Sequence, residues 1–370
     1  MRSIMGLINL TESEEFIKEV TIDRPLAALP FGGRYRLIDF VLSNMVNSDI
    51  SNVGILLRDK YRSLMDHLRS GKEWDLARKR DGLFILPPVY SENVCNTGDL
   101  HSIYEHLDYL QRSRDQYVLL SGSGCICNID FREACDFHEA VGADITVIYH
   151  QTPVGYDDFI NCTTLSTDAE HRVIDMEVNA SKVKTNKVAM GMYLMSRELL
   201  IDLVDRSIAR GEREFVRGLI IKNLEKLNIY GFAHSGYVGR IHSIVSYYYH
   251  NMALLRPDVW QEIFFNKGLI YTKVKDEAPA AYRAAAQVTG SLVANGCQIG
   301  GQVADSILFR GVKVQKEASV RDSLIMQNCE IGEGAILENV ICDKEVKITK
   351  GKRLIGEKRY PLVIKKGTVI

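Results

Sequence analysis

LPFGGRYRLIDF, residues 29–40, is the densest motif of the sequence. Gly32 and Gly33 allow the backbone to take positive φ angles and to approach a ligand closely. Arg34 and Arg36 add two positive charges to this turn. The apolar residues at 37, 38 and 40–42 then predict the buried face of a helix. The motif therefore predicts a ligand-binding turn near the start of an α/β domain.

Working outward, residues 1–250 alternate short apolar runs with stretches of helical periodicity. Residues 53–57, 117–120 and 143–149 are typical of buried strands, whereas residues 61–69 and 131–140 repeat apolar side chains with a helical period. Such alternation predicts a mostly parallel sheet covered by helices, which is a Rossmann-like α/β domain. Ligands of these domains bind beyond the carboxyl ends of the strands.

The sequence pattern changes after this domain. Residues 251–287 are interpreted as a connector, and residues 288–370 contain apolar positions spaced six apart, with Ile299-Gly300 and Ile331-Gly332 repeating one dipeptide. This period predicts a parallel β-helix of hexapeptide repeats, an element that stacks and assembles. All nine histidines lie at or before His250, so the β-helix lacks the histidine base of hexapeptide acyltransferases.

Bulk composition excludes several classes of function. The formal net charge is −1, which argues against nucleic-acid binding. No apolar run reaches the ~18 residues of a membrane span, and residues 1–8 are better interpreted as a first buried strand than as a signal sequence. The eight cysteines contain no CxxC pair, so we expect reduced buried thiols in a cytoplasmic protein without a metal site.

The motif at 31–40, with Leu42-Ser43-Asn44 and Asn47-Ser48, resembles the ADP-glucose pyrophosphorylase (glucose-1-phosphate adenylyltransferase) family. The likeness continues through residues 143–146 and 190–193 and into the hexapeptide array. It implies a nucleotidyltransferase domain followed by a left-handed parallel β-helix. It also implies tetramers that make ADP-glucose from ATP and glucose 1-phosphate with Mg²⁺, the entry step of bacterial glycogen synthesis.

The phosphate-binding loop of that family is missing. Family members open with GGxGxRL, whose backbone N–H groups hold the nucleotide phosphates. Residues 8–15 read INLTESEE here, so the glycines are absent and Glu12, Glu14 and Glu15 bring negative charge instead. A carboxylate ~4 Å from a phosphate charge costs about 1 kcal/mol in water and more in a closed site. The alternative is that the three glutamates only start a helix.

Further departures fall on the positions that the resemblance marks as catalytic or metal-binding. Leu26 stands at a lysine position, Ser123 at the aspartate of a Gly-Asp-His turn, and Arg240 at a second acidic position. Magnesium-assisted nucleotidyl transfer needs carboxylate oxygens. We therefore expect no catalytic residues and no metal site of its own in this chain. Glu177 keeps the acid of the sugar-phosphate motif Glu-Lys-Pro without its lysine, and Gly98-Asp99 replaces a Gly-Thr-Ala-Asp segment.

This pattern resembles the GlgD-type regulatory subunits of the family. It implies a non-catalytic or weakly active subunit of a heterotetramer, in which a catalytic partner subunit uses ATP and Mg²⁺. Two alternatives stay open: a competent enzyme in which Asp130 or Asp175 replaces the lost ligands, and a ligand-sensing scaffold with the same fold. A homo-oligomer is the alternative assembly for the chain alone.

The resemblance also links the basic residue after the two glycines to sugar-phosphate effectors. Arg34, assisted by Arg36, is therefore the candidate effector contact, because a guanidinium fork suits phosphate. Gly32, Gly33 and Glu177 complete the candidate ligand-binding residues. The alternative is that both arginines lie on a solvated turn or pair with Asp39. Separately, Tyr247-Tyr248-Tyr249 is interpreted as a buried helix surface where the domains meet.

Overall fold

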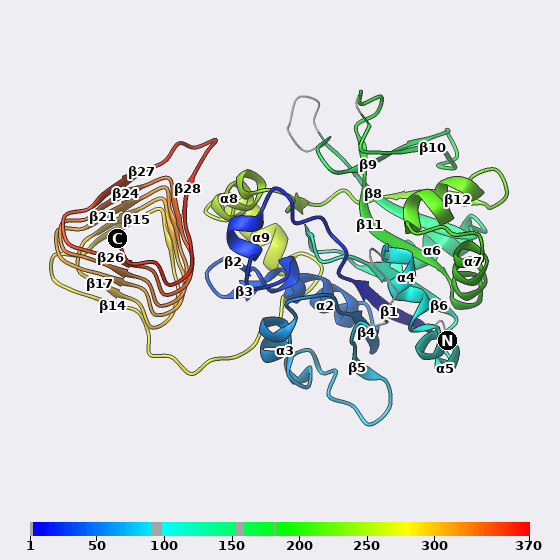
Figure 1. Ribbon diagram of the computed structural model, residues 1–370, viewed down its shortest axis with the longest axis horizontal. Coiled ribbons are helices and arrows are strands. Elements are labelled where there is room, and N and C mark those ends of the chain that lie inside the picture. Colours follow the sequence, from blue (N-terminus) through cyan, green and yellow to red (C-terminus); the bar gives the residue numbers. More distant parts are fainter. Residues whose placement is uncertain (1–2, 90–97, 153–158, 181) are drawn as a thin grey trace.

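The computed structural model describes residues 3–89, 98–152, 159–180 and 182–370. A domain built on a mixed sheet lies beside a stack of coils, with helices α8 and α9 and the β2–β3 hairpin between them (Figure 1). The seven cysteines in these ranges are free and all are buried, whereas Cys95 lies outside them. No helix in the described ranges is long and apolar enough to cross a membrane.

The first domain contains nine described strands in one sheet. Its order is β10-β9-β11-β6-β1-β4-β5, with β8 beside β11 and β12 beside β8. Strands β4, β1 and β6 run parallel, which confirms the predicted Rossmann-like core. The strands are β1 (Ile4–Asn9), β4 (Asn52–Leu56), β5 (Gly82–Leu86), β6 (Tyr117–Ser121), β8 (Ile145–Gln151), β9 (Thr163–Thr167), β10 (Val173–Val178), β11 (Lys187–Ser196) and β12 (Ile229–Ala233).

Helices cover both faces of this sheet. Met5 and Leu7 of β1 point into one core and Ile8 into the other, as alternating side chains of a central strand must. The helices are α1 (Lys18–Thr21), α2 (Leu37–Asn47), α3 (Arg62–Leu68), α4 (Asp99–Tyr104), α5 (Leu107–Arg112), α6 (Phe131–Ala140), α7 (Arg197–Ala209), α8 (Ile244–Ala253) and α9 (Pro257–Phe265). Short helical turns are η1 (Leu26–Ala28), η2 (Lys72–Trp74), η4 (Phe215–Ile220) and η5 (Ile221–Asn223).

Helix α6 shows why the sequence prediction was right at this position. The Asp130 carboxylate accepts the backbone N–H of Arg132 and caps the first turn. Phe131, Ala134 and Cys135 fall on one helix face and are all buried. Capping and periodicity therefore act together, and the helix covers the predicted residues 131–140.

The second domain is a left-handed parallel β-helix with three five-stranded sheets. Ile299, Val314, Ile331 and Ile348 stack in register through successive coils. Its strands are β14 (Ala281–Tyr282), β15 (Gln287–Thr289), β16 (Leu292–Val293), β17 (Gln298–Ile299), β18 (Gln302–Ala304), β19 (Ile307–Leu308), β20 (Lys313–Val314), β21 (Ser319–Arg321), β22 (Leu324–Ile325), β23 (Glu330–Ile331), β24 (Ile336–Glu338), β25 (Val340–Cys342), β26 (Lys347–Ile348), β27 (Arg353–Ile355) and β28 (Leu362–Ile364).

The domain limits differ from the predicted 1–250, 251–287 and 288–370. Helix α8 continues to Ala253, and α9 fills part of the predicted connector. The first coil begins with β14, which also lies within that connector. Both residues of β14 are exposed, because a terminal coil covers only one neighbour. The apolar period that marks the later coils is therefore missing from the first one.

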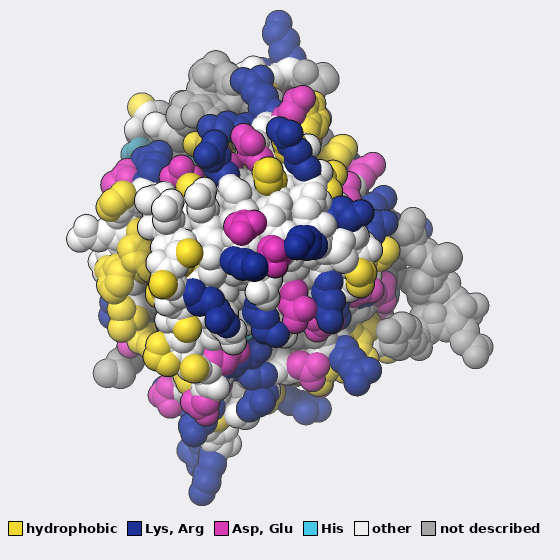
Figure 2. Space-filling model, turned by 90° about the vertical axis from the view of Figure 1, so that its left-hand side faces the viewer, with side chains coloured by type: hydrophobic (Ala, Val, Ile, Leu, Met, Phe, Trp, Pro, Cys, Tyr) yellow, Lys and Arg dark blue, Asp and Glu magenta, His cyan; other side chains and the backbone are white. Residues whose placement is uncertain are grey.

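The outer face of the β-helix is mixed in charge (Figure 2). Lysines and glutamates of successive coils pair across the sheet, with Glu330 Oε1 3.0 Å from Lys313 Nζ and Glu333 Oε1 2.8 Å from Lys350 Nζ. Hydrophobic side chains gather along one edge of the same view. The charge pairs link neighbouring coils, while the hydrophobic edge stays open to contact.

The motif at 29–40 forms the junction of the two domains. β2 (Pro30–Phe31) and β3 (Tyr35–Arg36) make a hairpin whose turn residues Gly32 and Gly33 have φ angles of 56° and 82°. The Gly32 N–H donates to Asn251 Oδ1 at 3.0 Å. A Cβ on Gly33 would lie 3.8 Å from Ala294 Cβ in the β-helix. The close approach that these glycines allow is thus made to the rest of the protein.

Helix α8 joins the same junction. The Tyr247 hydroxyl donates to Pro30 O at 2.6 Å, and the Tyr248 hydroxyl donates to Asp322 O of the β-helix at 2.6 Å. Both side chains are buried, whereas Tyr249 is 47% exposed. The interpretation of this tyrosine run as a buried surface between domains is confirmed for its first two residues.

Candidate functional site

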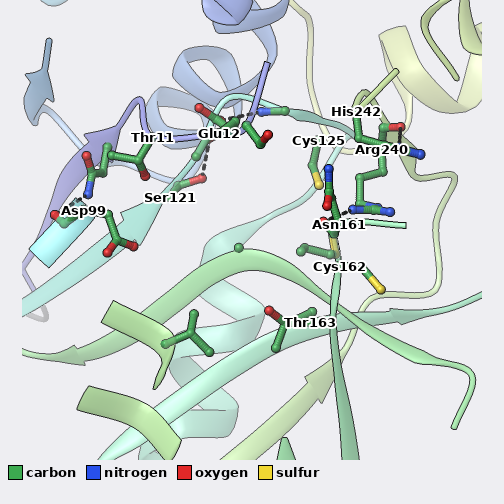
Figure 3. A pocket seen from close by; sticks show the side chains of 18 of the residues that line it. Thr11, Glu12, Asp99, Ser121, Cys125, Asn161, Cys162, Thr163, Arg240 and His242 are labelled. Atoms are coloured by element: carbon green, nitrogen blue, oxygen red, sulfur yellow. Dashed lines mark hydrogen bonds between the residues drawn. The ribbon is translucent and has the colours of Figure 1, made fainter. Parts of the chain in front are cut away.

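A cavity of about 300 Å³ opens where β1 and β6 end (Figure 3). Polar groups from distant segments line it, together with the apolar walls Leu120, Met190, Tyr193, Phe215 and Val216. The polar lining includes Asn9, Thr11, Glu12, Asp99, Ser121 and Arg240. This is the edge at which parallel α/β sheets bind ligands, so the predicted position is confirmed.

Two backbone features shape the cavity. Strand β11 has an irregularity between Ala189 and Met192, where Gly191 takes a φ angle of 70° and its carbonyl accepts the Gly122 N–H. The short strands β7 (Cys125–Ile126) and β13 (Gly239–Arg240) pair antiparallel, which places Arg240 opposite Cys125. Residues more than 100 positions apart therefore meet at one wall.

Glu12 fills the turn that follows β6. Its Oε1 accepts hydrogen bonds from the Ser123 N–H, from the Gly124 N–H at 2.8 Å and from Ser123 Oγ at 3.0 Å. Successive backbone N–H groups of this kind form a nest for an anion. Burial raises the pKa of Glu12, while the donated hydrogen bonds act against that rise. The chain thus supplies its own carboxylate to this nest.

The other two glutamates have different roles. Glu14 Oε1 accepts the backbone N–H of Leu26 at 2.8 Å, and its Oε2 lies 2.6 Å from Lys60 Nζ. Glu15 is exposed, and α1 begins at Lys18, after all three glutamates. The alternative that they start a helix is therefore wrong. The Leu26 side chain is 2% exposed and belongs to the core between the domains.

Arg240 lies at the opposite wall from Asp99 (Figure 3). Its Nη1 donates to Asn161 O at 2.7 Å and its Nη2 donates to Ile160 O at 2.6 Å. These bonds tie the segment before β9 to β13. Where the resemblance expects a metal-binding acid, this chain has a cation that holds the backbone in place.

A group of imidazoles lies next to Arg240. The His250 Nδ1 is 2.7 Å from the Tyr237 hydroxyl, and burial lowers the pKa of His250 to about 3, with His242, Arg240 and His150 adding repulsion. Burial also lowers the pKa of His150 to about 4. His150 and His250 are therefore neutral near pH 7.

The residues around the cavity do not fit a magnesium ion. The Glu12 carboxylate already accepts three hydrogen bonds, and the Asp99 Oδ1 accepts the Phe215 N–H at 2.8 Å. Burial raises the pKa of Asp99, which disfavours its charged form. Arg240 adds a positive charge where a divalent cation would need ligands.

The two substitute acids considered from the sequence lie elsewhere. Asp130 caps α6, pairs with Arg132 Nη2 at 2.8 Å and borders another cavity, whereas Asp175 is exposed on β10. The interaction with Arg132 lowers the pKa of Asp130. Glu177, also on β10, lies 2.5 Å from Lys184 Nζ and is not among the residues lining the cavity, so its ligand role stays a prediction.

At the domain junction the two candidate arginines have different environments. Arg34 is exposed, with its guanidinium 5.3 Å from the centre of the Tyr35 ring. Arg36 turns inward, and its Nη1 donates to Ser63 O at 2.7 Å. Burial lowers the pKa of Arg36 to about 10. Only the backbone N–H of Arg36 bonds Asp39, at 2.9 Å, so the two side chains do not pair as the alternative supposed.

The structure adds residues to the junction that the sequence analysis missed. The buried Arg24 Nη2 lies 2.5 Å from Asp343 Oδ2 of the β-helix. Next to it, burial and the charges of Arg36 and Arg24 lower the pKa of Lys344 to about 7. We call Arg24, Arg34, Arg36 and Lys344 the basic junction. Asp343 and Lys344 carry no motif, so only the docking of the two domains reveals them.

Comparison with known proteins agrees with this architecture. The nucleotidyl transferase family matches residues 17–250, and the GlmU-like, C-terminal hexapeptide family matches residues 277–360. Fold and cavity therefore define the class as a nucleotidyltransferase-fold protein that carries a hexapeptide β-helix.

Full-length relatives narrow this class. The glycogen biosynthesis protein GlgD of Bacillus subtilis (strain 168) is 40% identical over 99% of this chain and 96% of that protein, and GlgD of Geobacillus stearothermophilus is 39% identical over 99% and 97%. The glucose-1-phosphate adenylyltransferase of Bacillus mycoides (strain KBAB4) is 31% identical over 91% and 90%. The chain belongs to the ADP-glucose pyrophosphorylase family, and the predicted likeness to its GlgD-type members is confirmed.

Proposed function

We propose that this chain is a non-catalytic or weakly active regulatory subunit of a cytoplasmic glucose-1-phosphate adenylyltransferase. In this proposal it associates with a catalytic homologue in a heterotetramer and modulates ADP-glucose synthesis for glycogen. ATP, glucose 1-phosphate and Mg²⁺ are used by the partner subunit. The names of the relatives support the pathway, and the geometry of the cavity supports the loss of catalysis.

The observation that carries the proposal is the position of Glu12. Its carboxylate accepts both N–H groups of the turn at Ser123 and Gly124, so a phosphate that approached this turn would meet a negative charge and no free donors. At ~4 Å two like charges repel by about 1 kcal/mol in water and by several times more in a partly closed site. Nucleotidyl transfer needs the opposite charge at this point.

The basic junction supports the regulatory part of the proposal. Arg24, Arg36 and Lys344 lie within mutual electrostatic reach between the domains, and burial, together with repulsion from Arg36 and Arg24, lowers the pKa of Lys344. A sugar-phosphate effector that placed its charge here would relieve this repulsion and would contact both domains at once. Binding that prefers one arrangement of two domains shifts the populations of the states that a partner subunit senses.

The β-helix supports the proposed association with a homologous subunit. It exposes large hydrophobic side chains, and Figure 2 shows such side chains along one edge of this domain. Those in the last two coils include Ile336, Ile355, Tyr360, Leu362 and Val369. Exposed apolar side chains that gather on one surface are typical of protein interfaces. A homologous subunit is the partner that the proposal requires.

Reconstitution tests the proposal. The chain and a catalytic homologue are purified separately and mixed, and complexes are sized by light scattering while ADP-glucose formation is assayed. We expect four-chain complexes whose kcat, KM or effector response differs from that of the catalytic homologue alone. Separate species with additive rates would contradict the proposal.

Arginine variants test the regulatory part in the same assay. Arg34→Ala and Arg36→Ala in this chain should weaken the response of the complex to sugar phosphates by about tenfold, since one lost charge-assisted bond is worth ~1.5–3 kcal/mol. Arg359→Ala, an exposed arginine outside the basic junction, is the matched control. An unchanged response in both junction variants would remove the effector claim.

A further inference from the structure

The cavity beside Glu12 has an uneven distribution of hydrogen-bonding groups. The donors of the turn after β6 are already used, because the Ser123 and Gly124 N–H groups both point at Glu12 Oε1. Arg240 is the sole lysine or arginine among the described residues that line the cavity. Its Nη1 and Nη2 donate to the backbone carbonyls of Asn161 and Ile160. One N–H of each of these two nitrogens is thus used by the backbone.

Asn9 supplies an acceptor at the cavity wall. Asn9 is 7% exposed, and its Nδ2 donates to the Asp99 backbone carbonyl at 3.1 Å. Its Oδ1 is buried at the cavity wall, and no group in the described part of the chain donates to it. An unpaired buried amide oxygen costs about 1–3 kcal/mol, so a donor that reached it would recover that energy. The Asp99 carboxyl lies beside it and is a second acceptor.

The remaining walls suit a ring-sized molecule. Leu120, Met190, Tyr193, Phe215 and Val216 give the cavity an apolar side, and its volume of about 300 Å³ is at the lower end for ligand pockets. A few convergent polar groups on an otherwise apolar wall are the usual composition of a small-molecule site.

We propose that this cavity binds an uncharged, hydroxyl-rich ligand of the size of a sugar or nucleoside. Ligand hydroxyl or amino groups donate to Asn9 Oδ1 and to the Asp99 carboxyl, while Glu12 excludes phosphorylated forms of the same molecule. The inference rests on the proposed function in one respect, which is that the cavity does not turn over a nucleoside triphosphate. It adds a ligand class to a site that the proposed function leaves without one.

Matched ligand pairs test this proposal by calorimetry on the isolated full-length chain. Glucose is compared with glucose 1-phosphate, and adenosine with AMP, so that each pair differs by one phosphate. We expect one neutral probe to bind, and its phosphorylated counterpart to displace it at least tenfold more weakly. The readout is competition for the site of the bound neutral probe, rather than heat alone. It therefore reports on this cavity and not on anion binding at the basic junction.

Variants assign the effect to named residues. Asn9→Ala should weaken the neutral probe about tenfold, which corresponds to ~1.4 kcal/mol. Glu12→Gln and Glu12→Ala should reduce the preference against the phosphorylated probe, with Gln keeping an acceptor for the turn. Glu15→Ala, an exposed glutamate three residues away, should change neither. Near-ultraviolet circular dichroism checks that each variant is folded.

The proposal is overturned if both neutral probes fail to bind at 10 mM, or if a phosphorylated probe displaces its neutral partner equally well. It is also overturned if Asn9→Ala and Glu12→Gln, both folded, leave affinity and preference unchanged. The proposed regulatory function does not share these outcomes, because its test is the rate of ADP-glucose formation in the reconstituted complex. The two proposals can therefore fail separately.

Discussion

The cavity beyond β1 and the basic junction differ in how their charged groups are paired. In the cavity, the chain satisfies its own anion nest with Glu12 and its own cation with backbone carbonyls. At the junction, Arg36 and Lys344 are brought together with less compensation, and both have lowered pKa values. One region has internal partners for its charged groups, whereas the other holds positive charge that an external anion would stabilise. The two regions of this chain thus differ in the charge that they present to a ligand.

The Arg24–Asp343 ion pair is the strongest test of the junction. Arg24→Ala should lower the free energy of unfolding by about 3–5 kcal/mol, because it leaves a buried carboxylate without its charge partner. Urea unfolding followed by fluorescence measures this change. Arg132→Ala, which removes an exposed arginine from ion pairs with Asp49 and Asp130, is the control and should cost ~1 kcal/mol or less. Equal effects of the two variants would mean that the junction pair is not buried in solution.

The pH dependence of stability tests the imidazoles beside the cavity. The pKa of His250 is lowered to about 3 in the folded state, so the unfolded chain binds more protons than the folded one between pH 6.5 and 3. Stability should therefore fall as pH decreases through this window, by about 2 kcal/mol between pH 7 and pH 5 from this group. Thermal unfolding at several pH values measures the slope.

The variant His250→Asn should reduce that slope, because it removes one titrating imidazole, while His150, whose pKa is also lowered, still contributes. His106→Asn, at a partly exposed contact with the Pro87 carbonyl, should leave the slope unchanged. An unchanged slope in His250→Asn would contradict the expected contribution of this imidazole.

The glycine turn of the motif provides a packing test. Gly32→Ala combines a φ angle of 56° with a Cβ that would lie 2.9 Å from Leu254 Cδ1, so we expect a loss of about 2 kcal/mol. Gly334→Ala has a similar φ angle of 65° but no atom within 4 Å of the new Cβ. It should cost ~1 kcal/mol from backbone strain alone. Denaturant midpoints compare the two, and an equal loss would show that the turn is not packed at the junction.

The smallest expected effect is at α8. Tyr248→Phe removes the hydrogen bond to the Asp322 carbonyl and should cost about 1 kcal/mol. Tyr360→Phe, at a side chain that is 76% exposed, is the control and should be neutral within ~0.5 kcal/mol. If Tyr248→Phe is also neutral, this hydroxyl does not help to hold the β-helix against the first domain.

These contrasts also show what the sequence could predict. Strand β1 and helix α6 follow from local apolar patterns and capping, and the hexapeptide period predicts the later coils. The same period fails at β14, because the exposed terminal coil needs few large apolar residues. Local pattern is therefore sufficient where an element buries a repeated face.

The candidate site was only partly predictable. The resemblance marked Leu26, Ser123 and Arg240. The structure places Arg240 in the cavity lining and Ser123 in the turn bonded by Glu12, whereas Leu26 lies in the core between the domains. The hydrogen bonds of Glu12 to a turn 111 residues away follow from the docking of a loop, which no local pattern encodes. The same holds for Lys344, whose neighbours at the junction come from the other domain.

We propose that the cavity of this chain does not support nucleotidyl transfer. The most direct measurement is the initial rate of ADP-glucose formation by the isolated chain with saturating ATP, glucose 1-phosphate and Mg²⁺, beside the same amount of the reconstituted complex. We expect a rate for the isolated chain at or near background while the complex is active. A rate for the isolated chain comparable with that of the complex would contradict it.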